Sequence, residues 1–267
     1  MAENPSTPGP GGFVQPTLPS PAPSTTTTNR STVGLPHPRG HALRPGSAKE
    51  DKVRRYVEER LLHISRRYVK KYSLQEPDDQ VVGYRSMGEL CRDVEGLIDI
   101  IWLSGTPSLQ IPYLLNIAGE FTTWLTSFPP SPPGTFAVLR KLDHCFASLL
   151  TGADVETREP LPGFENGLRG GMSRTDMVRC KSLVEQTRVL VVEAMRREPG
   201  EDEDEDEDED EWGPGGTLTG DETDGGGRVG IWDEDDERLH MDVARVYENT
   251  LVQLGETLGE GGAVGDL

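Results

Sequence analysis

Apolar residues recur at helical spacing in six stretches of the chain. Positions three or four residues apart lie on one face of an α-helix, so this spacing predicts a helix with one buried face. The six stretches are separated by polar, glycine-rich or proline-rich segments and cover residues 49–72, 86–104, 108–126, 136–151, 173–196 and 233–258. We therefore predict an all-α fold, a bundle of about six helices.

Serine residues mark where several of these helices begin. A serine followed three residues later by an acidic residue forms a capping box, in which both side chains bind free amides near the helix start. Ser86 with Glu89 and Ser173 with Asp176 fit this pattern, and Ser108 is a further expected N-cap. The fifth helix is apolar over more than half of its circumference, so we expect it at the centre of the bundle.

Composition indicates how the remaining segments are organised. The first 46 residues hold ten Pro and eleven Ser or Thr, and such a segment buries too little apolar surface to offset the entropy of ordering. We expect a disordered tail over 1–46, a helical bundle over 47–196, a disordered acidic linker over 197–231, a C-terminal helix over 232–258 that closes the bundle, and a disordered tail over 259–267. The alternative is that the last helix leaves its apolar stripe for a partner.

The formal net charge of −19 lies almost entirely in one region. Residues 198–236 contain nineteen acidic residues against the single cation of Arg228, and so account for −18. The densest part is an unbroken alternation of Glu201, Asp202, Glu203, Asp204, Glu205, Asp206, Glu207, Asp208, Glu209, Asp210 and Glu211. Such a run either engages a basic partner, such as a histone or the first helix of this chain, or serves as a solubilising linker.

The first predicted helix carries the opposite charge. Residues 49–72 hold nine Lys or Arg against four Asp or Glu. The candidate contacts for nucleic acid or an acidic partner are Lys52, Arg54, Arg55, Arg66, Arg67, Lys70 and Lys71. A basic amphipathic helix binds phosphates. The same pattern also describes an ordinary solvated face, or a helix that binds the chain's own acidic run.

No motif predicts catalysis, a metal or a cofactor. The three Cys are odd in number and widely spaced, which favours neither a disulfide framework nor a metal site. Asp143, His144 and Cys145 are of the types found in thiol enzymes, but neighbours in a helix point about 100° apart and cannot form a nucleophile–base pair. No signal peptide or membrane-spanning segment is indicated. We expect a nuclear or cytoplasmic protein that is not an enzyme and takes no small-molecule substrate.

Four segments resemble a family of small fungal helical proteins that carries the name "meiotic recombination protein". They are DVEGLIDIIWLSGTPSLQIPYLLNIA, FPPSPPGTFAVLRKLDHCFASLLTG, GMSRTDMVRCKSLVEQTRVLVVE and MDVARVYENTLVQLGE. The resemblance covers roughly residues 84–196 and 239–256, and it implies a role in meiotic recombination. It transfers no functional residues, because a RecA-like ATPase needs a Gly-Lys phosphate-binding loop and the chain has no Gly-Lys pair.

These observations predict an interaction or scaffold subunit of a nuclear or cytosolic complex that binds protein partners. The alternative is a DNA-associated accessory factor in meiotic recombination that binds through the basic first helix. Binding to DNA weakens steeply as salt rises, whereas binding through apolar stripes tolerates salt, so the two hypotheses can be distinguished.

Overall fold

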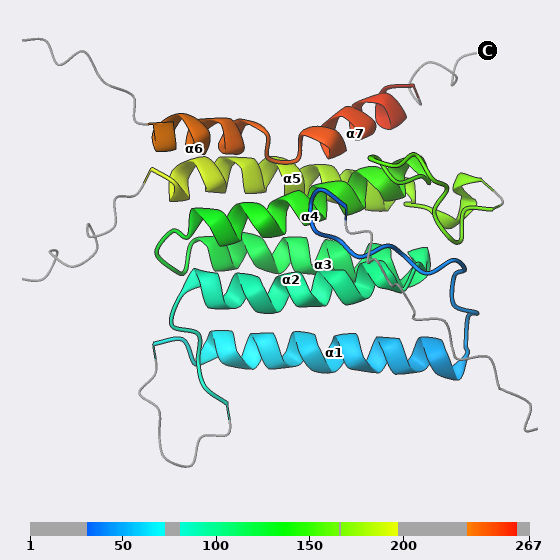
Figure 1. Cartoon of the computed structure of the whole chain (residues 1–267), viewed down its shortest axis with the longest axis horizontal. Helices are drawn as coiled ribbons and strands as arrows, with labels where there is room; N and C mark the ends of the chain where they lie inside the picture. The colour runs from blue at the N-terminus through cyan, green and yellow to red at the C-terminus, as the bar shows by residue number, and fades with distance from the viewer. Residues whose placement is uncertain (1–30, 73–80, 166, 197–233, 261–267) are drawn as a thin grey trace, which may run out of the picture.

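The computed structural model describes residues 31–72, 81–165, 167–196 and 234–260. Over these residues the predicted all-α class is confirmed, and the β-structure is limited to one isolated bridge between Ala153 and Pro160. The helices are α1 (Ala48–Val69), α2 (Met87–Leu103), α3 (Pro107–Leu125), α4 (Pro132–Thr151), the 3-10 turn η1 (Leu168–Gly170), α5 (Arg174–Ala194), α6 (Glu234–Ala244) and α7 (Glu248–Glu260) (Figure 1). The segments 1–30, 197–233 and 261–267 lie outside the described residues. Disorder was predicted for all of these residues except 232 and 233.

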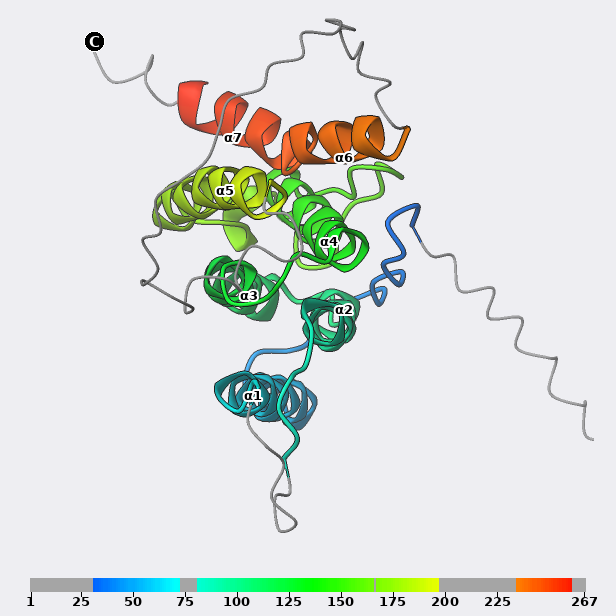
Figure 2. The same ribbon diagram turned by 90° about the vertical axis from the view of Figure 1, so that its left-hand side faces the viewer.

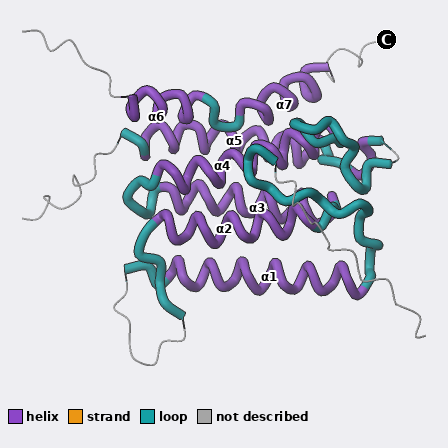
Figure 3. The backbone as a smooth tube through the Cα atoms, in the orientation of Figure 1, coloured by secondary structure: helices purple, strands orange, loops and turns teal. Residues whose placement is uncertain are grey.

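The helices form a stack of layers. Seen end-on, α1 lies on one side, followed by α2 beside α3, then α4 beside α5, and α6 with α7 cross the far side (Figure 2). Contacts follow this order, since α1 packs on α2, α2 on α4, α3 on α5, and α7 on both α4 and α5. The connecting loops lie at the ends of the helices, apart from the residues before α1, which run across them (Figure 3).

The centre of the bundle is α4 rather than the predicted fifth helix. Every residue from 141 to 150 is buried. In α5, by contrast, the side chains of Val178 and Val189 are 53% and 67% exposed. The buried face of α5 is therefore narrower than its apolar pattern predicted.

Two polar side chains of α4 bind two different neighbours. The Lys141 Nζ lies 2.7 Å from Asp99 Oδ1 and 3.2 Å from Glu95 Oε2, both on α2. The His144 Nε2 lies 2.9 Å from Asp154 Oδ2 in the loop that follows α4. A buried charge is costly unless it is paired, so these contacts hold α2 and the loop in defined positions on α4.

The last predicted helix is broken into α6 and α7, where we predicted one helix over 232–258. At the break, Tyr247 is buried and adopts a left-handed φ of 57°. The carboxylate of Asp143 on α4 accepts hydrogen bonds from the Thr250 backbone amide at 2.8 Å and from Asn249 Nδ2 at 2.9 Å. The first turn of α7 is therefore capped by a carboxylate from another helix, which suits the free amides and the dipole there.

The helix starts agree only in part with the predicted caps. At α5, Ser173 and Asp176 form the full capping box. At α2, Ser86 accepts from the Glu89 amide, but the Glu89 carboxylate is instead 3.4 Å from Arg67 on α1. Ser108 is not an N-cap, because α3 begins at Pro107, which suits the first helical position.

The 31–46 segment, expected to be part of a disordered tail, packs against the bundle. Leu35 and Leu43 are buried at 1% and 7% exposure. The Arg39 amide donates to the Leu103 carbonyl at 3.3 Å, and the Leu43 amide donates to Thr106 Oγ1 at 2.9 Å. Composition did not predict this ordered segment, because two leucines at suitable positions suffice to anchor a short extended segment.

We expect Asp143→Ala to lower the free energy of unfolding by about 2–3 kcal/mol, because it removes the cap of α7 and leaves buried donors without a partner. Urea denaturation would measure the loss, and limited proteolysis would show earlier cleavage at α7. The matched control is Asp242→Ala, which removes a carboxylate on α6 that lies 3.6 Å from Arg140 in an exposed pair. Equal destabilisation by the two substitutions would contradict the assignment.

Candidate protein-binding surfaces

The first candidate surface is the outer side of α1, the helix at one edge of the stack (Figure 2). Its inner side packs on the bundle through the buried Val57 and Ile64, with Val53, Leu61 and Tyr68 partly buried around them. These residues recur every three or four positions, as predicted for the stretch 49–72, whereas Tyr72 at the end of that stretch is 60% exposed and lies beyond the helix end. The opposite side of α1 faces solvent.

Not all of the basic residues of α1 face solvent. The guanidinium groups of Arg60 and Arg67 each lie 2.7 Å from an oxygen of Asp93 on α2, and the Tyr84 hydroxyl donates to the same carboxylate at 2.8 Å. Arg67 also lies over the Tyr84 ring at 4.0 Å. Burial raises the pKa of Tyr84, so its hydroxyl remains a donor. Arg67 therefore helps to hold α1 against α2 and is not available to bind a partner.

The other predicted contact residues fall into two groups. Lys70 and Lys71 are half-buried at the helix end, and the Lys71 ammonium lies 4.5 Å from the Tyr68 ring. The four exposed members are Lys52, Arg54, Arg55 and Arg66. Arg54 pairs with Glu50 at 2.9 Å within the same helix.

One exposed row of α1 lies opposite the buried stripe, and we call it the outer stripe. It steps by three and four residues through Lys52, Arg55, Glu59, Leu62, Arg66 and Val69. Leu62 is 51% exposed and Val69 is 78% exposed. This combination of cations and aliphatic side chains suits an acidic amphipathic segment of a partner. The cations were predicted from the sequence, but Leu62 and Val69 were not. Their position on the face opposite the apolar stripe is the signal that could have identified them.

The second predicted contact, the acidic run from Glu201 to Glu211, lies outside the described residues. It therefore stays a prediction, together with the question of which basic partner it meets.

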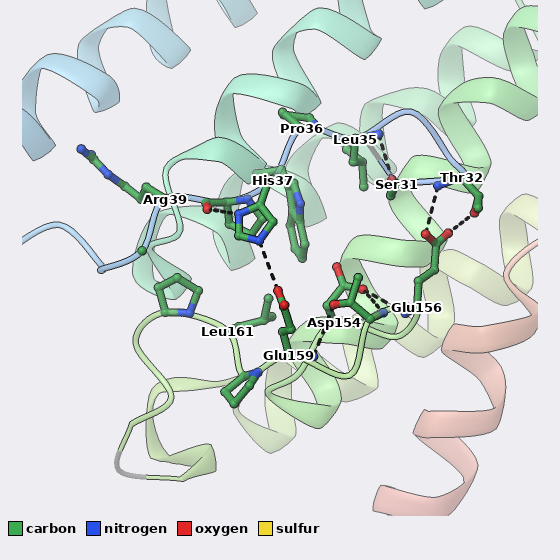
Figure 4. A pocket seen from close by; sticks show the side chains of 16 residues that line it. Ser31, Thr32, Leu35, Pro36, His37, Arg39, Asp154, Glu156, Glu159 and Leu161 are labelled. Atoms are coloured by element: carbon green, nitrogen blue, oxygen red, sulfur yellow. Dashed lines mark hydrogen bonds and ion pairs between the residues drawn. The ribbon is translucent and has the colours of Figure 1, made fainter. Parts of the chain in front are cut away.

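A second candidate surface is a pocket between the residues before α1 and the loop after α4 (Figure 4). The cavity has a volume of about 330 Å³ and lies between residues 31–40 and 154–162, with Trp102 of α2 also lining it. Thr32 donates to Glu156 through its amide at 3.0 Å and through its hydroxyl. The imidazole Nε2 of His37 lies 3.2 Å from Glu159 Oε2. This pocket was not predicted from the sequence, because it requires residues 31–40 to be ordered.

The residue types of a thiol enzyme are used structurally. Asp143 caps α7 and His144 pairs with Asp154. The side chain of Cys145 has 0% exposure, and burial raises the pKa of its thiol. Among the described residues no group of His, Cys, Asp and Glu is placed to hold a metal ion, and none of the described helices is long and apolar enough to span a membrane.

Comparison with known families places this helical bundle. The model of the family described as subunit 11 of the general transcription factor TFIIH matches residues 83–255. This match covers well over half of the chain, from just before α2 into α7, and the chain belongs to that family. The residues before α1 and α1 itself lie outside the matched range.

Two fungal proteins are similar to the chain. An uncharacterized protein of Schizosaccharomyces pombe is 28% identical over 148 residues, which cover 54% of this chain and 79% of the relative. The general transcription and DNA repair factor IIH subunit TFB6 of Saccharomyces cerevisiae is 24% identical over 197 residues, which cover 58% of this chain and 55% of the yeast protein. No solved structure matches the chain.

These comparisons correct the resemblance drawn from the sequence. A small fungal helical family is supported, but its description is that of a TFIIH subunit, and a role in meiotic recombination is not supported.

The reactivity of the three buried thiols tests the expectation that the protein is not an enzyme. Burial raises the pKa of Cys91 and of Cys180 to about 12, and it also raises that of Cys145. Because the thiolate is the reactive form, we expect no measurable reaction of the folded protein with a chromogenic disulfide reagent at pH 8. Unfolding in guanidinium should release all three thiols. Fast reaction of one thiol in the folded state would contradict this assignment.

Proposed function

We propose that this protein is a non-enzymatic subunit of a TFIIH-type general transcription factor in the nucleus. The observation that carries the proposal is the family match over residues 83–255, a range that includes the central helix α4 and most of α7. The match includes Asp143 as well as the Asn249 and Thr250 donors that it binds. It therefore spans helices α2 to α5 and part of α7 rather than one local motif.

The burial of polar groups supports a role in binding rather than catalysis. Lys141, Asp143 and His144 each contact a structural partner in the bundle. A catalytic group needs access to a substrate, and these three side chains are between 3% and 6% exposed.

We further propose that the outer stripe of α1 binds an acidic segment of a neighbouring subunit. Lys52, Arg55 and Arg66 are exposed, and Leu62 and Val69 lie in the same row, where a partner would bury them. Exposed cations mainly steer association and select the partner, whereas the buried aliphatic groups supply affinity. The acidic run from Glu201 to Glu211 is a second proposed contact, for a basic partner.

Affinity purification of the full chain from its native cells tests the proposal. We expect TFIIH subunits to be recovered in stoichiometric amounts and to remain bound through a high-salt wash. Recovery of a different complex, or of no stable complex, would overturn the assignment to TFIIH.

A charge-reversal variant tests the outer stripe separately. Combining Lys52→Glu, Arg55→Glu and Arg66→Glu should reduce recovery of at least one subunit, while Arg67 is left unchanged because it holds α1 on α2. The matched control reverses the exposed cations Arg174, Arg179 and Lys181 on α5 and should leave recovery unchanged. Unchanged recovery with the α1 variant would exclude the stripe and leave the assignment to TFIIH standing.

The same variant addresses the DNA-binding alternative. If the three cations contacted phosphates, the affinity of the purified chain for duplex DNA would fall with a slope of about −2.7 in log K against log salt. We expect no such salt-dependent binding. Its presence in the wild type and loss in the α1 variant would favour the DNA interpretation over the acidic partner.

A further inference from the structure

The pocket between residues 31–40 and 154–162 combines apolar walls with an acidic side. Leu35, Leu161 and Trp102 line it, all at 5% exposure or less, so much of its wall is buried hydrocarbon and aromatic ring. Its volume of about 330 Å³ is at the small end of the range for ligand pockets. It is therefore suited to a single side chain or small molecule rather than to a helix.

Three carboxylates lie on the acidic side, and they differ in how many hydrogen bonds they already accept. Asp154 accepts from the amides of Glu156 and Thr157 at 2.9 Å each and from His144. This carboxylate shapes the loop and is not available to a ligand. Glu156 holds Thr32.

The Glu159 carboxylate is the one that can accept further hydrogen bonds. Its one described partner is the imidazole of His37, and the two side chains are 65% and 59% exposed. The side chain of Arg39 points away from the three carboxylates (Figure 4). Among the described residues, the buried His144 pairs with Asp154, whereas Glu159 meets the exposed imidazole of His37, which a stronger cation can replace.

We propose that this pocket binds an arginine side chain of a protein partner. The aliphatic stem enters along Leu161, and the guanidinium lies between the Trp102 ring and Glu159, with which it pairs in place of His37. A carboxylate accepts two parallel hydrogen bonds from a guanidinium, and the flat cation also packs favourably on an indole ring, which an ammonium matches less well. This site belongs to the folded chain itself and does not rest on the assignment to TFIIH.

The supporting geometry is already present in the chain. A nitrogen of His37 reaches Glu159 at 3.2 Å, and the hydrogen bond to Glu159 raises the pKa of His37, as expected where a carboxylate favours a bound cation. His37 therefore shows where a nitrogen donor meets the Glu159 carboxylate in the lining of the pocket.

The test uses the full chain and two small probes. N-acetyl-arginine amide carries the guanidinium, and N-acetyl-citrulline amide has nearly the same shape without the charge. Each is titrated while amide and indole resonances are followed by NMR, with chloride salt matched between titrations. We expect saturable shifts at Thr32, Glu159 and the Trp102 indole with the arginine probe only. Equal shifts with the citrulline probe, or none with either, would overturn the proposal.

Three substitutions distinguish a binding role from a structural one. Glu159→Gln should weaken binding of the arginine probe about fivefold, the upper value for an exposed ion pair, whereas Glu120→Gln on the exposed side of α3 should not change it. His37→Ala should strengthen binding, because it removes the competing imidazole. If His37 served only to hold the N-terminal residues in place, His37→Ala would weaken binding, and that result would overturn the proposal.

Discussion

The structure depends on how its central helix satisfies the polar side chains that it buries. Lys141, Asp143 and His144 occupy nearly one turn of α4 and point in different directions, so each meets a different neighbour. Leaving any of these groups unpaired in the interior would cost several kcal/mol. The packing of α2, of α7 and of the loop after α4 is therefore specified by hydrogen bonds as well as by apolar contact.

This arrangement separates the interior from the surfaces proposed for binding. The bond from Asp143 to Thr250 joins residues 107 positions apart in the chain, on either side of the stretch 197–233. The cost of closing a loop rises only slowly with its length, so the contact tolerates a long intervening segment. The outer stripe of α1 lies outside the region that matches the family, as do residues 31–40 of the arginine pocket. The outer stripe and one wall of the arginine pocket therefore lie outside the matched range, whereas residues 154–162 lie within it.

The sequence allowed most of the fold to be predicted, but little of either binding surface. Apolar periodicity located α1 to α5 and the stretch that α6 and α7 occupy, and the capping box at Ser173 was correct in detail. The break at Tyr247 was not predictable, because Val243, Val246 and Tyr247 continue a regular apolar stripe. The carboxylate of Asp143, which is distant in the sequence, makes a new helix start favourable there. Likewise, Arg67 was indistinguishable from the exposed cations until Asp93 was found beside it.

By itself the sequence determined the helical class, the apolar face of most helices and the charge of the first helix. These properties depend on residues within a few positions of one another, which is the range over which helical periodicity acts. The tertiary structure decided that α4 is central, that Asp143 caps α7, and that residues 31–40 form one wall of a pocket. Each of these depends on groups far apart in the chain, whose meeting is set by the packing of the whole bundle.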